Sequence, residues 1–275
     1  MSSLLYHYTN AAGIYGMLKD YDEKTHPYLT MWATNASFLN DSSEFSFGKE
    51  ICKEAFSAYE AKLGISDDNC IMNGYNYEGL ARKKKMNATP CIISFSTTVN
   101  NASMWEMYSM GGTGIAIEFE KEALEHIDDY TTLSPCIYCT SYWDLLEQEN
   151  LVEKFYSQSC NINCKGTENA EIMRFAQAYA LIINMAPRIK HSAYKFEDEY
   201  RLIRYGEDTP LFRVRKDIII PYKEVLVPIE AVKGFVIGPT ANYDYMYSSL
   251  ETFLASKGLS SLDECIVKSE VPYRG

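Results

Sequence analysis

The sequence predicts a single α+β domain over residues 1–275, with a mixed or antiparallel sheet at its core and several helices packed around it. Three observations support this fold class. Predicted strands and helices are interspersed irregularly, without the alternating rhythm of a doubly wound parallel sheet. No glycine-rich phosphate loop joins a predicted strand to a helix. The 275 residues can bury a large core, and they contain no internal repeat and no obvious linker.

The hydrophobic periods and turn residues predict the individual elements. In chain order these are a strand at 1–10, helices at 11–19 and 44–63, with a strand at 29–34 between them, an irregular segment at 64–88, a strand at 90–96, a short helix around 104–108, a strand at 113–119, a strand at 135–142, helices at 144–158 and 168–186, a strand at 196–205, a strand-rich segment at 216–238, a helix at 243–257 and a closing strand at 264–269.

The start of the predicted helix at 44–63 is marked by Asn40-Asp41-Ser42-Ser43-Glu44. A serine or aspartate there would cap the exposed backbone amides, and Glu44 would complement the positive end of the helix dipole. Four of its apolar positions are expected to be buried: Phe45, Ile51, Phe56 and Leu63.

The chain carries a formal net charge of −11, and such an acidic surface repels phosphate backbones, so broad nucleic-acid binding is disfavoured. The one dense basic run, Arg82-Lys83-Lys84-Lys85, is either a local basic patch or a solvated helix end, and the second interpretation is preferred. The first residues lack the charged and apolar regions of a signal peptide, and no stretch has the length of a membrane span. We therefore expect a cytoplasmic protein without a membrane partner, whose eight cysteines are thiols.

Two groups of polar residues lie on predicted strands. His7 stands beside Tyr8 and Thr9 at the end of the first strand, where a histidine can bind a ligand or serve as a hydrogen-bonded structural residue. In Ser94-Phe95-Ser96-Thr97 the alternate hydroxyls would point to one face of a strand. The structural alternative for this second group is an edge strand with one wet side.

A third group, Trp105 and Tyr108, has helical spacing, so both rings would lie on one face, either as a ring-stacking platform or as core packing. A fourth group lies in the predicted strand at 196–205. There Glu197, Glu199 and Arg201 would share one face. Two neighbouring carboxylates raise one another's pKa and a nearby cation offsets this, an arrangement typical of sites that grip a hydroxyl or move a proton. The fourth group is therefore the preferred candidate site.

The cysteines offer an alternative candidate site, which would bind zinc. Cys136 and Cys139, with Cys160 and Cys164, could supply four thiolates to zinc. Cys136 and Cys139 would point to opposite faces of a strand, however, and the second pair has a loose spacing. We therefore expect no metal, and the sequence leaves zinc binding by these cysteines open.

The ordered set of motifs resembles the bacterial family catalogued as "domain of unknown function twenty-nine seventy-one". The resemblance extends over nearly the whole chain. Its motifs are Tyr6-His7-Tyr8-Thr9, Leu39-Asn40-Asp41-x-x-Glu44, Ser94-Phe95-Ser96, Trp105-x-x-Tyr108, Phe196-x-x-Glu199-x-Arg201 and the closing Ser269-Glu-Val-Pro-Tyr-Arg274.

More loosely, the order of these motifs is similar to that of the ADP-ribosyltransferase superfamily. That similarity implies that His7 holds the adenosine ribose of NAD, that Tyr108 stacks on nicotinamide and that Glu199 is the catalytic carboxylate. It also implies that Glu197 supplies the Glu-x-Glu spacing of transferases that modify polar acceptors. The further residues expected at the NAD site are Tyr8, Thr9, Ser94, Ser96, Trp105 and Arg201, with Asn40, Asp41 and Glu44 as additional candidates.

The resulting hypothesis is an NAD-consuming ADP-ribosyltransferase or NAD glycohydrolase, with a toxin or phage-defence role implied by the resemblance alone. One alternative is a non-enzymatic module that binds a nucleotide or a partner. Another is a metal-dependent nucleic-acid-processing enzyme that uses Asp41, Glu44, Glu197 and Glu199. The acceptor of any ADP-ribose and the oligomeric state are left open.

Overall fold

A computed structural model describes residues 3–41, 43–74, 89–159, 170–206 and 208–272. Within these ranges ten strands form one large sheet, and the order of eight of them is β12-β11-β4-β1-β3-β2-β10-β9. Their bounds in that order are Ile266–Lys268, Val232–Ile237, Ile115–Glu120, Leu4–Thr9, Cys91–Ser96, Tyr28–Asn35, Ile218–Pro228 and Leu211–Arg215. The remaining two strands, β8 (Glu199–Arg204) and β5 (Thr131–Pro135), branch from β3. All pairs are antiparallel except β11 with β12, so the predicted mixed sheet is confirmed.

The sheet divides at β3. Along one edge of β3, strand β8 pairs over the whole length, from Cys91 to Ser96. Along the other edge, β1 pairs only at Ser96 and β2 only at Ile92 and Cys91. The two strands therefore diverge, and the backbone around Ser94 faces the resulting split without a partner strand. Because buried backbone polar groups require hydrogen bonds, something other than a strand must satisfy this edge.

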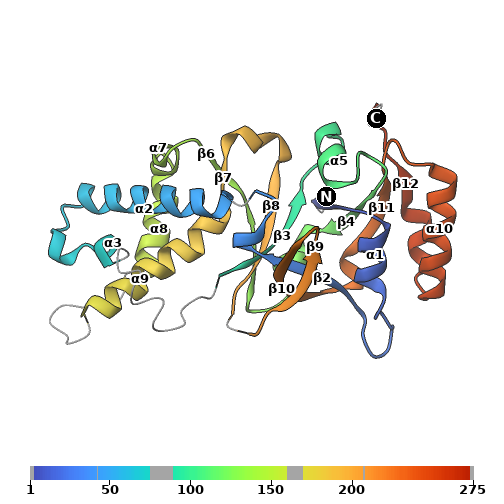
Figure 1. Cartoon of the computed structure of the whole chain (residues 1–275), viewed down its shortest axis with the longest axis horizontal. Helices are drawn as coiled ribbons and strands as arrows, with labels where there is room; N and C mark the ends of the chain where they lie inside the picture. Colours follow the sequence, from blue (N-terminus) through green and yellow to red (C-terminus); the bar gives the residue numbers. More distant parts are fainter. Residues whose placement is uncertain (1–2, 42, 75–88, 160–169, 207, 273–275) are drawn as a thin grey trace.

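Helices cover the sheet at one end of the molecule (Figure 1). They are α1 (Ala11–Leu18), α5 (Ala102–Tyr108), α6 (Lys121–Glu125) and α10 (Tyr243–Ser256). Ile14 and Leu18 of α1 are buried in the main core. Helix α5 is followed by Gly111 and Gly112, both at positive φ, a conformation that glycine adopts without steric cost.

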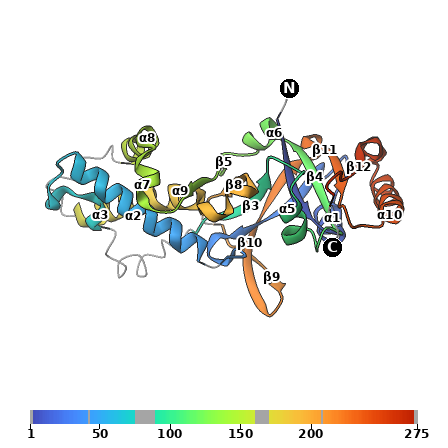
Figure 2. The same ribbon diagram turned by 90° about the horizontal axis from the view of Figure 1, so that it is seen from above.

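A second group of helices extends from the other end of the sheet (Figures 1 and 2). It contains α2 (Glu44–Lys62), α3 (Ile71–Gly74), α7 (Tyr142–Leu146), α8 (Glu149–Ser159) and α9 (Ala170–Met185), together with the two-stranded sheet of β6 (Ile137–Cys139) and β7 (Ile189–His191). Of the four predicted buried positions of α2, Phe45, Ile51 and Phe56 are buried in this second core. Leu63 is 53% exposed, because α2 ends at the residue before it and the chain turns away.

Short 3-10 helices complete the described elements: η1 (Ala36–Phe38), η2 (Asp67–Asn69), η3 (Ala186–Arg188), η4 (Ser192–Glu197), η5 (Ile229–Ala231) and η6 (Ser260–Cys265). Three predicted elements are corrected. The helix at 144–158 is interrupted between α7 and α8, and the strand at 135–142 is interrupted between β5 and β6. The strand at 196–205 begins only at Glu199, because η4 precedes it and Asp198 adopts a left-handed conformation with φ 44°.

The hairpin of β9 and β10 projects from the sheet (Figure 2). Strand β9 was not predicted. The basic run at 82–85 lies outside the described residues, as do Tyr273 and Arg274 of the closing motif. In the described part of the chain, no helix combines the length and the apolar character needed to cross a bilayer.

Candidate functional site

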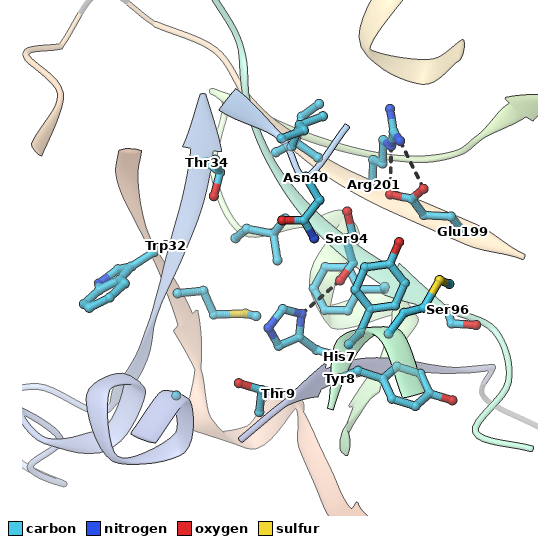
Figure 3. A pocket seen from close by; sticks show the side chains of 18 of the residues that line it. His7, Tyr8, Thr9, Trp32, Thr34, Asn40, Ser94, Ser96, Glu199 and Arg201 are labelled. Carbon is cyan, nitrogen blue, oxygen red and sulfur yellow. Dashed lines mark hydrogen bonds and ion pairs between the residues drawn. The ribbon is translucent and has the colours of Figure 1, made fainter. Parts of the chain in front are cut away.

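A cavity of about 680 Å³ lies at the split between β1 and β2 (Figure 3). This volume is within the range of roughly 300–1,000 Å³ that is typical of small-molecule and cofactor sites. Its walls come from β1, α1, β2, the 39–44 segment, β3, α5, β7, η4, β8 and β9, so segments far apart in sequence meet here. The predicted site residues that line it are His7, Tyr8, Thr9, Asn40, Asp41, Glu44, Ser94, Ser96, Tyr108, Glu197, Glu199 and Arg201.

His7 bridges the split in the sheet. Its Nδ1 lies 2.9 Å from the carbonyl oxygen of Ser94, the backbone group that lacks a partner strand. A carbonyl oxygen can only accept, so Nδ1 carries the proton and Nε2 keeps its lone pair. Burial lowers the pKa of His7, the Ser94 contact opposes this, and the positive charge of Arg213 lowers the pKa further. The cavity wall therefore holds a neutral imidazole with one unprotonated ring nitrogen.

Five ionisable side chains form a buried cluster at another wall of the cavity. The ammonium group of Lys190 contacts Glu197 and lies 2.7 Å from Oε2 of Glu199. Arg201 pairs with Glu199 through Nε, at 2.9 Å from Oε1, and through Nη2, at 3.0 Å from Oε2. Nη2 of Arg201 also contacts Glu44. With all five groups ionised, three carboxylates face two cations, and the ion cluster has one net negative charge.

Burial and neighbouring charges shift the pKa values of this ion cluster in opposite directions. Burial raises the pKa of Glu199, but Arg201 and Lys190 outweigh it and hold the value at about 2. Burial also lowers the pKa of Lys190, yet Glu199, Glu44 and Glu197 together raise it above its ordinary value. For Glu44 burial is the larger effect, and its pKa is raised. Glu199 is therefore ionised at neutral pH, and its charge depends on two cations.

The turn at Asp198 explains how Glu197 and Glu199 meet. Their predicted common face on one strand is wrong, because Glu197 ends η4 and only Glu199 belongs to β8. Asp198 joins the end of η4 to the start of β8 in a left-handed conformation, which aspartate tolerates better than most residues. Ser96 stabilises this turn, since its hydroxyl donates to the carbonyl oxygen of Glu197 at 2.7 Å. The hydroxyl of Tyr108 donates to Oε1 of Glu197 at 2.9 Å.

Two aromatic residues predicted at the NAD site pack in the core, and only one of them also borders the cavity. Trp105 does not line the cavity, is completely buried, and donates from its indole nitrogen to the carbonyl oxygen of Val99 at 2.8 Å. Tyr8 borders the cavity, but its ring packs edge-on against Trp105 at 5.0 Å, and its hydroxyl donates to Thr98. Strand alternation explains why Tyr8 packs against Trp105, because its side chain lies on the face of β1 opposite to His7.

The predicted side-chain cap of α2 is not made by Ser43, its N-cap residue, and the neighbouring polar side chains make other contacts. The carboxylate of Asp41 accepts from the backbone and the hydroxyl of Ser43, and Ser43 makes no side-chain cap. Glu44 stands in the first turn of α2 as predicted, but its carboxylate contacts Arg201. Asn40 accepts from Nη1 of Arg215 at 2.8 Å.

The sequence did not indicate three cationic residues of the cavity wall: Lys190 on β7, and Arg213 and Arg215 on β9. Lys190 belongs to a strand of three residues, which is too short to show a periodic pattern. In the described ranges, no group of three histidine, cysteine, aspartate or glutamate residues is arranged to hold a metal ion. Cys136 and Cys139 are free thiols, whereas Cys160 and Cys164 lie outside the described residues.

The low pKa of Glu199 predicts a specific acid dependence of stability. A carboxyl group whose folded pKa lies below its ordinary value of 4.5 contributes stability above that pH, and the contribution is lost as the pH falls towards about 2. The difference corresponds to about 3 kcal/mol, at about 1.36 kcal/mol for each pH unit. Urea unfolding of the wild type and of Glu199→Gln should therefore show a free-energy gap that shrinks with acid. A gap that stays constant between about pH 6 and about pH 2 would contradict this assignment.

Comparison with known proteins tests the resemblance. No curated protein and no solved structure matches the chain, so the looser similarity to ADP-ribosyltransferases is not supported by a relative. The segment that matches a family model begins within α5, before Tyr108, and ends within β8, and it includes Lys190, Glu197, Glu199 and Arg201. It is narrower than the expected resemblance, which included His7 and Ser94. Residues 104–202 match the family described as "Protein of unknown function (DUF2971)", which confirms the family resemblance over that segment.

Proposed function

We propose that this protein cleaves the bond between nicotinamide and ribose in NAD, as an ADP-ribosyltransferase or an NAD glycohydrolase. The observation that carries the proposal is the pair of groups that line this cavity from two of its walls. A neutral His7 with an unprotonated Nε2 and an ionised, buried Glu199 line the same cavity. Both kinds of group suit NAD, which presents ribose hydroxyls as donors and develops positive charge when the glycosidic bond breaks.

His7 would accept a hydrogen bond from a ribose hydroxyl. Its Nδ1 is committed to the Ser94 carbonyl, which fixes the ring orientation and the tautomer. Ser94 and Thr9 also border this part of the cavity, and the Ser94 side chain is exposed there. A positioned acceptor of this kind binds substrate and transition state alike, so His7 is expected to act mainly on substrate affinity.

Glu199 would stabilise the positive charge of the reacting ribose. When the bond between the ribose C1′ and the pyridinium nitrogen breaks, its electron pair leaves with nicotinamide, which departs as a neutral molecule. C1′ then carries positive charge until the acceptor attacks it and the acceptor loses its proton. A preorganised carboxylate beside C1′ would favour this state without rearrangement. The net negative charge of the ion cluster of Glu44, Lys190, Glu197, Glu199 and Arg201 acts in the same direction.

Tyr108 and Glu197 would complete the nicotinamide end. The ring of Tyr108 borders the cavity, and its hydroxyl is tied to Glu197, so the ring has a defined position against which nicotinamide can stack. Glu197 would orient the polar group of an acceptor. The cytoplasmic location and a toxin or phage-defence role belong to this proposal, since both would follow from consuming or transferring part of a central metabolite.

The test uses the purified wild type with NAD labelled in the nicotinamide ring or in the adenylate, with and without bacterial lysate. Released nicotinamide is the expected product. Adenylate label on a lysate component identifies a transferase, and free ADP-ribose identifies a glycohydrolase. No nicotinamide release with water or with any lysate component contradicts the proposal. NAD-dependent thermal stabilisation without turnover would instead favour a binding module, and metal-dependent nuclease activity without NAD would favour a nucleic-acid enzyme.

His7→Phe should lower kcat/KM for NAD by about 10- to 100-fold, mainly through KM, because a hydroxyl of the substrate loses its acceptor. The matched control is His26→Phe, since His26 does not line the cavity and contacts Tyr28 and Thr30. Equal kinetic constants for the two variants would contradict the role assigned to His7.

A further inference from the structure

Arg213 and Arg215 present two guanidinium groups to the cavity. They stand two residues apart on β9, so their side chains lie on the same face of the strand. Both line the cavity, next to Trp32, Thr34 and Asn40. Figure 3 shows Trp32 and Thr34 on the opposite side of the cavity from Glu199. Arg213 donates to Thr34 and Arg215 to Asn40, and neither arginine pairs with a carboxylate of the ion cluster in the described part of the chain.

Neither arginine has a carboxylate within salt-bridge distance among the described residues. Arg213 donates from Nη2 to the Thr34 hydroxyl at 2.7 Å, and its buried Nε has no partner. Arg215 donates to Oδ1 of Asn40 and to the carbonyl oxygen of Phe38, each at 2.8 Å. These partners are neutral, although the chain has 37 acidic residues and only 26 basic ones. The two positive charges are left uncompensated.

The cationic side chains are also held in place. The guanidinium of Arg213 lies over the rings of Trp32 and Tyr222, at 5.4 Å and 5.8 Å from their centroids. The two rings are themselves 5.0 Å apart. Arg215 is fixed by the polar groups of the segment before α2. A rigid guanidinium with unused N–H groups matches the geometry of phosphate oxygens, which it can bind in pairs.

We propose that Arg213 and Arg215 form a subsite for the phosphate groups of a nucleotide diphosphate. In its application to NAD this inference rests on the proposed function, because the pyrophosphate would lie at the arginines while the nicotinamide ribose lies at Glu199. A dianionic group supplies the missing counter-charge for both side chains. The subsite explains why two arginines without acidic partners line a cavity of a strongly acidic protein.

Calorimetric titration tests the subsite without catalysis. ADP, inorganic pyrophosphate and adenosine are titrated into the wild type, Arg213→Gln, Arg215→Gln, the double variant and Arg204→Gln. Arg204 is the matched control, because it is a strand arginine outside the cavity and pairs with Asp128. We expect each single cavity variant to weaken ADP and pyrophosphate binding by about 10- to 100-fold and to leave adenosine binding unchanged. Arg204→Gln should bind as the wild type does.

Arg215→Lys retains the charge but loses the planar fork, so its affinity for ADP should lie between those of the wild type and Arg215→Gln. Thermal unfolding identifies any variant that fails to fold. The proposal is overturned if the folded double variant binds ADP and pyrophosphate as tightly as the wild type, or if the wild type binds neither. Arginine-dependent ADP binding without NAD cleavage would uphold the subsite and reject the proposed function. NAD cleavage with an unchanged KM in the double variant would uphold the proposed function and reject the subsite.

Discussion

Lys190→Met is expected to lower the free energy of unfolding by about 3–5 kcal/mol, the usual cost of removing one partner of a buried ion pair. Lys190 is 4% exposed and contacts both Glu197 and Glu199. In the variant three carboxyl groups would face Arg201 alone, so at least one buried negative charge would lose its compensation. Urea unfolding at neutral pH, followed by circular dichroism, measures the effect.

Lys223→Met is the matched control, because Lys223 is also buried, with 6% of its surface exposed. Its partner is Asp208, whose side chain is 49% exposed and remains hydrated. Its cost should be about 1 kcal/mol. Adding Glu197→Gln to Lys190→Met should recover part of the lost stability, since it removes one uncompensated carboxylate. The loss in Lys190→Met should also shrink at acid pH, where the carboxyl groups become neutral. Equal losses for the two lysine variants would show that Lys190 does not hold the ion cluster together.

Glu199→Gln is expected to reduce NAD cleavage by about 100- to 1,000-fold, the usual effect of removing one group that stabilises transition-state charge. The variant should fold, because the ion cluster would then contain two carboxylates and two cations. Its binding of NAD should change little, so the loss should appear in kcat. Steady-state release of nicotinamide measures both constants.

Two further glutamate variants test whether the reaction depends on a carboxylate at position 199 or only on the net charge of the ion cluster. Glu44→Gln changes the net charge of the ion cluster by the same amount but from α2, so we expect a much smaller loss than for Glu199→Gln. Glu60→Gln alters a buried carboxylate outside the cavity, where Glu60 accepts from the backbone of Ile71 and Met72, and its activity should be that of the wild type. Equal losses for Glu44→Gln and Glu199→Gln would mean that net charge, rather than a carboxylate at position 199, governs the reaction.

Local patterns predicted the elements whose signals lie within a few residues. The alternation in β1 and the hydroxyls of β3 placed His7 and Ser94 on strands, and the cavity lies where those strands diverge. The same patterns could not show that β1 and β2 separate, because strand pairing is decided by contacts between distant segments. Trp105 shows a related limit, since helical spacing places a ring on a face but does not reveal whether that face is covered.

In the ion cluster, the sequence predicted correctly that Glu197 and Glu199 lie together, although the secondary structure predicted for them was wrong. Glu197 and Glu199 were expected to meet on a common strand face, and they meet instead across the turn at Asp198. Lys190, which joins them, gave no signal because a lone lysine in a three-residue strand resembles any surface lysine. Arg213 and Arg215 were missed for the same reason, since β9 becomes recognisable only through its pairing with β10.

A crystal structure of Glu199→Gln with NAD bound tests the central claim most directly, because the slow variant should retain the intact substrate. We expect the nicotinamide ribose beside residue 199, the nicotinamide ring against Tyr108, a ribose hydroxyl at Nε2 of His7 and the pyrophosphate at Arg213 and Arg215. NAD bound outside this cavity, or a cavity that stays empty in the folded variant at saturating NAD, would contradict the account.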